Sequence, residues 1–226
     1  MRYKNVKEGV FLSRPNRFIA LVEIDGKSEI CHVKNTGRCK ELLIPGVRVF
    51  LEESDNPARS TKFDLIAVKK GKMLINVDSQ APNKVIYEWI RDENYFKNID
   101  VFKPETRYGD SRFDLYLEAD GRWIFAEVKG VTLEEEGIVM FPDAPTQRGV
   151  KHINELIRAK EEGYEAYIFF VVQMDECLFF TPNARTHPEF ATALRSAAEQ
   201  GVKVLALTCH TTPDSLEIKD FVDVRL

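Results

Sequence analysis

The sequence contains no long apolar run, and this absence excludes a class of proteins. No stretch of the 226-residue chain approaches the roughly 18 consecutive apolar residues of a transmembrane helix. Residues 1–5 are not followed by an apolar stretch, so we expect no secretory signal. The sequence therefore predicts a protein without a membrane partner.

Cysteine is also scarce. The four cysteines, Cys31, Cys39, Cys177 and Cys209, are scattered and show no C-x-x-C spacing, so the sequence indicates neither a zinc site nor a disulfide framework. Cys31 and Cys177 lie in apolar, strand-like runs, where we expect them to be small core residues. This use of cysteine fits a protein of the reducing cytoplasm.

Three well-defined catalytic and nucleotide-binding motifs are missing. The chain has no G-x-G-x-x-G, no P-loop and no G-x-S-x-G, so dinucleotide-binding, Walker-type and serine-hydrolase functions lack their signatures. It contains no internal repeat and no low-complexity segment. A function must therefore be sought in pairs of residues that the fold brings together.

Charge is distributed unevenly along the chain. Residues 1–82 carry 15 Lys and Arg against 10 Asp and Glu, a balance of +5; residues 83–226 carry 17 against 26, a balance of −9. The two balances add up to the net charge of −4. This asymmetry predicts two units, 1–82 and 83–226, of which the first could bind phosphate backbones and the second could hold cations.

The first unit has the pattern of a small all-β domain. Short runs of strand composition are separated by breaks rich in Gly, Pro and Asn. The runs cover residues 10–12, 18–24, 29–33, 47–51 and 63–69, and Asp25-Gly26 marks a hairpin. Five short strands, with a helical turn at residues 39–43 after the third, are compatible with an OB-like β-barrel, a frequent oligonucleotide binder.

Basic residues gather near the expected loops of this barrel. They are Arg14, Arg17, Lys34, Arg38 and Lys40. Together they could form a basic groove that follows a nucleic-acid strand. Each one alone could equally belong to a solvated rim of the barrel.

The second unit has the pattern of an α/β domain. A helix is expected from Asn83 as its cap, with a further helix from Thr146 to about Glu162 and a third from Pro188 to Gly201. Residues 166–172 are continuously apolar, which is typical of a strand buried on both faces. Strands at 177–180 and 202–208 complete a mixed sheet with helices on both faces, an αβα sandwich. The acidic run 134–136 is expected to be a solvated turn.

The centre of this unit is the hairpin at residues 112–131. Asp120-Gly121 suits a two-residue turn because both positions tolerate positive φ. That turn opposes Leu117 with Ile124, Leu115 with Ala126 and Phe113 with Val128, which are all apolar pairs. The same register predicts that Asp114 lies directly opposite Glu127 on the other face, with Lys129 two residues further along.

Two carboxylates at directly opposed strand positions repel each other. A divalent cation such as Mg²⁺ (or Mn²⁺) would relieve this repulsion, because hard cations bind carboxylate oxygens. A metal ion held by Asp114 and Glu127 could activate water and polarise a phosphodiester, with Lys129 orienting the water or stabilising the developing charge. The alternative is a solvated salt-bridge cluster of the same three residues.

Two helices could add residues to this site. Arg148, His152 and Glu155 share a face of the helix that begins at Thr146, where Arg148 and His152 could bind a phosphate or protonate a leaving group. Taken alone, His152 is better interpreted as an ordinary histidine on a helix surface. Glu88, in the first helix of the unit, could face the metal site or could be a surface charge.

An Asp on one strand followed by Glu-x-Lys on the next, here Asp114, Glu127 and Lys129, resembles the PD-(D/E)XK nuclease superfamily. A wider set of segments resembles the sugar fermentation stimulation protein A (SfsA) family over nearly the whole chain. These segments are Asn35-Thr36-Gly37-Arg38, Pro45-Gly46, residues 77–83, Ser111-Arg112-Phe113-Asp114, Glu127-Val128-Lys129, Phe141-Pro142-Asp143-Ala144 and Arg148-Gly149-x-Lys151-His152. One departure is Lys34, which stands where the family pattern leads us to expect Pro.

The resemblance implies an N-terminal OB-like domain, a C-terminal nuclease-like domain and DNA binding without sequence specificity. Arg17, Lys34, Arg38, Arg148, Lys151 and His152 would then be the nucleic-acid contacts. Three functions remain open at this point: a Mg²⁺-dependent nuclease, a non-catalytic DNA-binding regulator of sugar (maltose) metabolism genes that retains the nuclease scaffold, and a protein-interaction module with no nucleic-acid partner.

Overall fold

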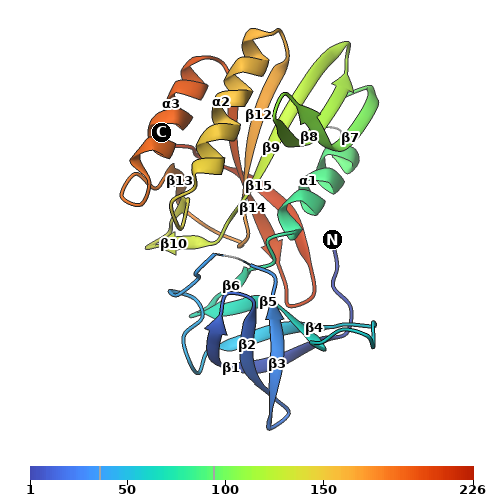
Figure 1. Cartoon of the computed structure of the whole chain (residues 1–226), viewed down its shortest axis with the longest axis vertical. Helices are drawn as coiled ribbons and strands as arrows, with labels where there is room; N and C mark the ends of the chain where they lie inside the picture. The colour runs from blue at the N-terminus through green and yellow to red at the C-terminus, as the bar shows by residue number, and fades with distance from the viewer. Residues whose placement is uncertain (36, 94) are drawn as a thin grey trace.

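The computed structural model describes residues 1–35, 37–93 and 95–226. A β-barrel at the N-terminal end of the chain packs below an α/β part that contains the three helices of these described residues (Figure 1). Thr36, which belongs to one of the segments that carry the family resemblance, lies outside the described residues. No helix in the described ranges is long and apolar enough to span a membrane.

The barrel is built from the five strands that the sequence predicts. They are β1 (Val6–Asn16), β2 (Ile19–Ile24), β3 (Lys27–Val33), β4 (Arg48–Glu53) and β5 (Phe63–Lys70), with a short β6 (Met73–Asn76) added at the edge. The strand order is β3-β2-β1-β4-β5, and a parallel pairing of β3 with β5 closes the sheet. This closure confirms the OB-like barrel. Its interior is filled by fully buried side chains such as Phe11, Leu51 and Leu65.

The predicted Asp25-Gly26 turn joins β2 to β3. Both residues have positive φ, 51° and 74°, and Ile24 pairs with Lys27 across the turn. These are the values that a two-residue hairpin turn of this type requires. The same turn recurs at Asp120-Gly121 in the predicted hairpin at residues 112–131, where φ is 52° and 71°.

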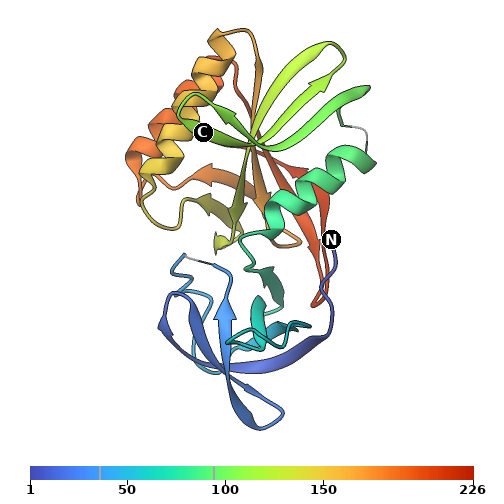
Figure 2. The same ribbon diagram turned by 45° about the vertical axis from the view of Figure 1, so that its right-hand side comes forward.

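The α/β part is a six-stranded mixed sheet with helices on both faces, as predicted. The strand order is β15-β14-β12-β9-β8-β7. These strands are β7 (Ile99–Tyr108), β8 (Ser111–Ala119), β9 (Arg122–Val131), β12 (Glu165–Val172), β14 (Lys203–Thr211) and β15 (Leu216–Val222). Helix α1 (Ala81–Asp92) covers one face, while α2 (Gln147–Glu161) and α3 (Pro188–Glu199) cover the other (Figure 2).

A second, three-stranded sheet lies beside the main one. It consists of β10 (Leu133–Glu135), β11 (Ile138–Phe141) and β13 (Phe179–Pro182), in the order β10-β11-β13. The expectation of a solvated turn at residues 134–136 is wrong for Glu134, which is buried and lies 2.5 Å from the ammonium of Lys70 in the barrel. The charge of a barrel lysine explains why a carboxylate can be buried at this position.

Helix α1 begins three residues earlier than expected. Gln80 is its N-cap residue and Pro82 lies in its first turn, a position that tolerates Pro because no intrahelical partner is needed there. Asn83 is therefore not the cap, and its side chain is free to contact the neighbouring hairpin. The division of the chain between residues 82 and 83 stays a prediction, although that point lies inside α1.

A buried polar network joins the barrel to the α/β part. The Tyr3 hydroxyl accepts a hydrogen bond from Asn76 at 2.9 Å and donates one to Asp78 at 3.3 Å. From the other side, the Gln173 amide donates to the side chain of Asn76 at 2.8 Å and to the backbone carbonyl of Asp78 at 3.0 Å. Buried networks with every member paired fix a single arrangement. This one fixes the barrel beside the end of β12.

Candidate functional site

The central hairpin has the predicted register over most of its length. Residues from Leu115 to Ala119 on β8 pair with Ala126 to Arg122 on β9, so that opposed residue numbers add up to 241. Strand β9 also pairs in parallel with β12, which places it in the middle of the sheet. The functional candidates Asp114, Glu127 and Lys129 lie just beyond the last regular pair.

The regular pairing ends where the acidic residues begin. The backbone N–H of Val128 donates to Oδ2 of Asp114 at 2.8 Å, so a side chain takes the place of the next backbone partner. Phe113 does not pair with Val128 as expected: its ring packs against Phe125, with ring centres 5.1 Å apart, on the side of α2. The prediction that Asp114 and Glu127 oppose each other as a simple cross-strand pair is therefore wrong in detail.

Asp114 is held from the α1 side of the sheet. Its Oδ1 accepts a hydrogen bond of 3.0 Å from the side chain of Asn83, and its backbone carbonyl accepts one from the hydroxyl of Tyr87. Burial and then the negative charge of Glu127 raise the pKa of Asp114 above its ordinary value, against the opposing effect of Lys129. The two carboxylates are thus near enough to repel each other although different helices hold them.

Glu127 is held from the α2 side and is almost completely buried, with 2% of its surface exposed. Its Oε1 accepts hydrogen bonds from Nδ1 of His152 and from Nζ of Lys129. Although burial raises the pKa of Glu127, the bond from His152 and the charge of Lys129 lower it below its ordinary value. Its Oε2 is buried and has no hydrogen-bond partner in the described part of the chain.

His152 holds Glu127 in one orientation. The Arg148 guanidinium donates from Nε to His152 Nε2 at 3.4 Å, so Nε2 is the acceptor of the ring and Nδ1 carries the proton that it donates to Glu127. His152 is only 5% exposed. Its interpretation as an ordinary surface histidine is therefore wrong. Helix α2 can present it because Thr146 caps the helix as predicted, accepting a bond of 3.0 Å from the N–H of Gly149.

A cationic pocket opens beside His152. It has a volume of about 510 Å³, and its lining includes Arg107, Arg112, Arg148 and Lys151, with Asp110 as the one acidic residue. Arg148 and Lys151 are exposed to solvent on the first turns of α2. The pocket, which we call the α2 pocket, offers several cations to a phosphate within reach of the residue that holds Glu127.

Two other residues predicted for the site, Lys34 and Glu88, form ion pairs away from it. Lys34 lies within 3.2 to 3.6 Å of carboxylate oxygens of Glu52, Asp64 and Asp78, so its charge is balanced inside the barrel and it is not an open cation as predicted. Glu88 lies 2.6 Å from the amino group of Met1 and not beside Glu127, so it is not an accessory metal ligand.

Arg17 and Arg38 remain exposed on the barrel. With Lys40, they line a second cationic pocket of about 250 Å³, which we call the barrel pocket. Arg14 also lines it, but its guanidinium donates to four backbone carbonyls at 2.7 to 2.9 Å and shapes the loops. Sequence reasoning gave Arg14 and Arg17 the same role, and only the three-dimensional contacts separate them.

The donors at the hairpin fit a hard divalent cation that keeps some of its own water. The described residues contain no group of three or more His, Cys, Asp or Glu side chains arranged around a metal position. The protein groups available to a cation at the hairpin are the carboxylates of Asp114 and Glu127. Of their oxygens, Oε2 of Glu127 is an unpaired acceptor. Mg²⁺ is commonly bound by one or two carboxylates together with water and substrate phosphates. The residue types present fit that mode of binding.

Comparisons with known proteins agree with this architecture. The family model of the SfsA N-terminal OB domain matches residues 12–77. The family model of the sugar fermentation stimulation protein RE domain matches residues 80–215. Sugar fermentation stimulation protein homologs of Desulfitobacterium hafniense (strain Y51) and Clostridium beijerinckii are 62% and 57% identical over 226 residues. These alignments cover 100% of this chain and 99% and 100% of the relatives.

A solved structure, described as Pyrococcus furiosus SfsA in complex with Ca²⁺, is similar over the whole chain. It superposes with a TM-score of 0.91 at 29% sequence identity, covering 100% of this chain and 98% of the other. This match confirms the arrangement of an OB-like barrel with a mixed α/β sheet.

The repulsion at Asp114 predicts a measurable cost to stability. A carboxyl group whose folded pKa is raised stabilises the fold at low pH and loses that contribution as the pH rises through the folded pKa. Asn keeps only one of the two acceptors that bind Val128 and Asn83, which changes the stability by an amount that does not depend on pH. Between pH 4 and pH 8 in EDTA, the unfolding temperature of the wild type should therefore fall relative to that of Asp114→Asn by about 2–4 °C, the shift that ~1 kcal/mol produces in a chain of this size.

Differential scanning calorimetry between pH 4 and pH 8 measures how the difference in unfolding temperature between the two proteins changes with pH. Glu118→Gln, a change of the same kind on the same strand, is the control, and its difference from the wild type should stay constant. A difference between the wild type and Asp114→Asn that also stays constant from pH 4 to pH 8 would contradict the assigned repulsion.

Proposed function

The chain belongs to the sugar fermentation stimulation protein family, and we propose that it binds DNA and hydrolyses phosphodiester bonds with the help of a divalent metal ion, Mg²⁺ or Mn²⁺. The proposed metal ligands are Asp114 and Glu127, and Lys129 is the third catalytic residue. The observation that carries the proposal is the buried, unpaired Oε2 of Glu127, beside a second carboxylate whose pKa is raised.

A buried acceptor without a partner is costly for a folded protein. Binding of a cation to Oε2 would remove that cost and would also relieve the repulsion between Glu127 and Asp114. The Pyrococcus furiosus relative is described in complex with Ca²⁺, which supports a divalent cation for the family's fold. When bound, such an ion polarises a phosphodiester and lowers the pKa of a bound water.

The chain's own residues hold and orient the reacting groups. His152 and Lys129 both bind Oε1 of Glu127, which leaves Oε2 available to a cation. Lys129 is half-buried, so its charge is only partly screened and can stabilise negative charge developing on a phosphate. Arg148 and Lys151 of the α2 pocket bind the neighbouring phosphates. His152 acts through Glu127 and Arg148 and is a positioning residue.

Binding to DNA would use the exposed cations of the α2 pocket and the barrel pocket. Contacts to phosphates fix the position of a strand but carry no sequence information. We therefore propose binding without sequence specificity, with Arg17, Arg38, Arg148 and Lys151 as the contacts. A non-catalytic regulator of sugar metabolism genes is the second candidate, and it is favoured by one observation: the barrel pocket has its own cations and does not depend on Glu127.

Cleavage assays separate these two functions. With Mg²⁺ or Mn²⁺, wild-type protein should cut labelled DNA, and Glu127→Gln or Asp114→Asn should slow the cut by about 10³-fold or more, since metal-ion stabilisation is worth several kcal/mol. Both variants should still bind the same DNA in EDTA. Glu118→Gln should cleave like the wild type.

Wild-type protein that cuts neither single- nor double-stranded substrates with either metal would overturn the nuclease proposal. If that protein still bound DNA, the non-catalytic regulator would remain as the candidate function. Equal cleavage by the wild type and Glu127→Gln would place the reaction elsewhere in the chain.

The DNA-binding proposal is tested by its salt dependence. Each phosphate contact that is lost should reduce the slope of log Kd against log salt concentration by about one. We expect this for Arg17→Ala and for Arg38→Ala, measured by fluorescence anisotropy in EDTA. Lys27→Ala, at the tip of the β2–β3 hairpin away from the α/β part (Figure 1), should leave the slope unchanged. A slope that is the same in all four proteins would exclude these arginines as phosphate contacts.

A further inference from the structure

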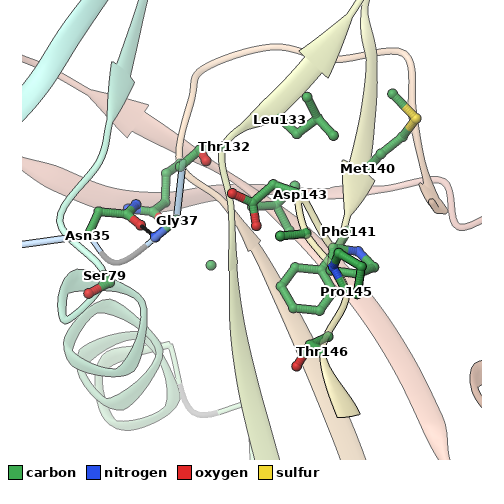
Figure 3. Close-up of a pocket in the computed structure, with 15 residues that line it drawn as sticks. Asn35, Gly37, Ser79, Thr132, Leu133, Met140, Phe141, Asp143, Pro145 and Thr146 are labelled. Atoms are coloured by element: carbon green, nitrogen blue, oxygen red, sulfur yellow. Dashed lines mark hydrogen bonds between the residues drawn. The ribbon is translucent and has the colours of Figure 1, made fainter. Parts of the chain in front are cut away.

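A pocket of about 300 Å³ lies at the junction of the barrel and the α/β part. We call it the junction pocket. Figure 3 shows Asn35, Gly37 and Ser79 on one side of it, and Asp143, Phe141, Pro145 and Thr146 on the other. The first group belongs to the barrel loop and the approach to α1, and the second to the segment that connects β11 to α2. Neither the nuclease site nor the phosphate contacts proposed above use this pocket.

The junction pocket adjoins the barrel pocket and includes the residue that caps α2. Gly37 lines both the junction pocket and the barrel pocket. At the other end, Thr146 lines the junction pocket and caps α2, whose next residues, Arg148 and Lys151, line the α2 pocket. Gly130, directly after Lys129 on β9, also lines the junction pocket. A chain molecule lying across the three pockets would therefore pass the proposed catalytic residues.

The charges along this path alternate. The α2 pocket and the barrel pocket each contain four Lys or Arg side chains, whereas no Lys or Arg is among the described residues that line the junction pocket. Its walls are partly apolar, with Met140, Phe141, Pro142 and Pro145, and Asp143 is the one charged residue in that described lining. Asp143 would repel a phosphate there, and the nearby guanidinium of Arg14 is bonded to the backbone carbonyls of Asn35 and Gly37. A neutral ligand with apolar faces and polar edges therefore suits this pocket.

We propose that the junction pocket binds one unstacked nucleobase of a single-stranded nucleic acid, whose phosphates on either side bind the barrel pocket and the α2 pocket. The inference rests on the nucleic-acid binding in the proposed function and is independent of cleavage. A base in a duplex is stacked and paired, so it would have to be extruded to enter, whereas a base of a single strand is already free. Single strands are typically bound in this way, by cationic grooves that follow the backbone and by contacts with base faces.

The position of Asp143 predicts which bases fit. Its Oδ2 lies so close to Gly37 that a Cβ atom at Gly37 would be only 2.6 Å away, which places the carboxylate between the two sides of the junction. A carboxylate accepts a hydrogen bond from an exocyclic amino group such as N4 of cytosine. Cytosine and adenine should therefore bind better than thymine, which has no amino group.

The test uses oligonucleotides in which one base at a time is replaced by an abasic site. Binding is measured in EDTA, so that cleavage cannot interfere. Ala144 lines the pocket and is half-buried, so Ala144→Trp should fill it, while Ala144→Ser leaves it open and is the matched control. Ser79→Trp fills the pocket from the opposite side and serves as the second filled variant if Ala144→Trp does not fold.

For the wild type and Ala144→Ser, one abasic position in a short oligo(dC) should weaken binding about tenfold, the value typical of one base contact. For Ala144→Trp and Ser79→Trp, the unmodified oligonucleotide should already bind about tenfold more weakly, and the abasic position should have no further effect. Asp143→Asn should remove the preference of the wild type for oligo(dC) over oligo(dT).

Binding that does not depend on any base position, or an abasic effect that is the same in wild type and in the filled variants, would overturn the inference while leaving DNA binding intact. Tighter binding to duplex than to single strands would also overturn it. If the wild type bound no oligonucleotide at all, both this inference and the proposed DNA binding would fail. Loss of cleavage with normal binding would affect only the proposed nuclease.

Discussion

A carboxylate buried in the sheet, with one oxygen fully engaged and the other unpaired, is the constraint around which the α/β part is arranged. Glu127 can be ionised in this position because His152 and Lys129 both bind its Oε1. Those bonds require α2 to lie against β9, and α2 is placed there by its Thr146 cap and by buried residues such as Ile153 and Leu156. The packing that stabilises the fold thus also leaves Oε2 unpaired and available to the proposed cation.

Asp114 completes the site because the hairpin stops being regular. If β8 and β9 had kept their register, Val128 would have bonded to a backbone carbonyl and Asp114 would have pointed to the α2 side. Instead its side chain binds the N–H of Val128 and the amide of Asn83. Helix α1 and helix α2 each hold one carboxylate from opposite faces of the sheet. The barrel is fixed beside the end of β12 by the network of Tyr3, Asn76, Asp78 and Gln173.

Patterns within short segments predicted most of the fold. The Asp25-Gly26 and Asp120-Gly121 turns, the Thr146 cap and the apolar run of β12 depend on local residues, and the structure confirms all four. Contacts between segments that are far apart in the sequence could not be predicted from such patterns. The sequence alone indicates a surface histidine at His152, but in the structure this side chain binds Glu127 of β9. It indicates a solvated Glu134, which in the structure lies against Lys70 of the barrel. It indicates a free cation at Lys34, which in the structure is surrounded by three carboxylates. The sequence pattern brings Asp114, Glu127 and Lys129 to one end of the hairpin, but it does not give the direction of their side chains.

The most direct test of the account is to locate a divalent ion. Crystals soaked in Mn²⁺ and measured at an anomalous wavelength should show a peak about 2.0–2.4 Å from Oε2 of Glu127, in contact with Asp114, and Glu127→Gln crystals treated in the same way should lose it. No peak at this position at millimolar Mn²⁺, in wild-type crystals that diffract well, would contradict the claim that the unpaired carboxylate oxygen is a metal ligand.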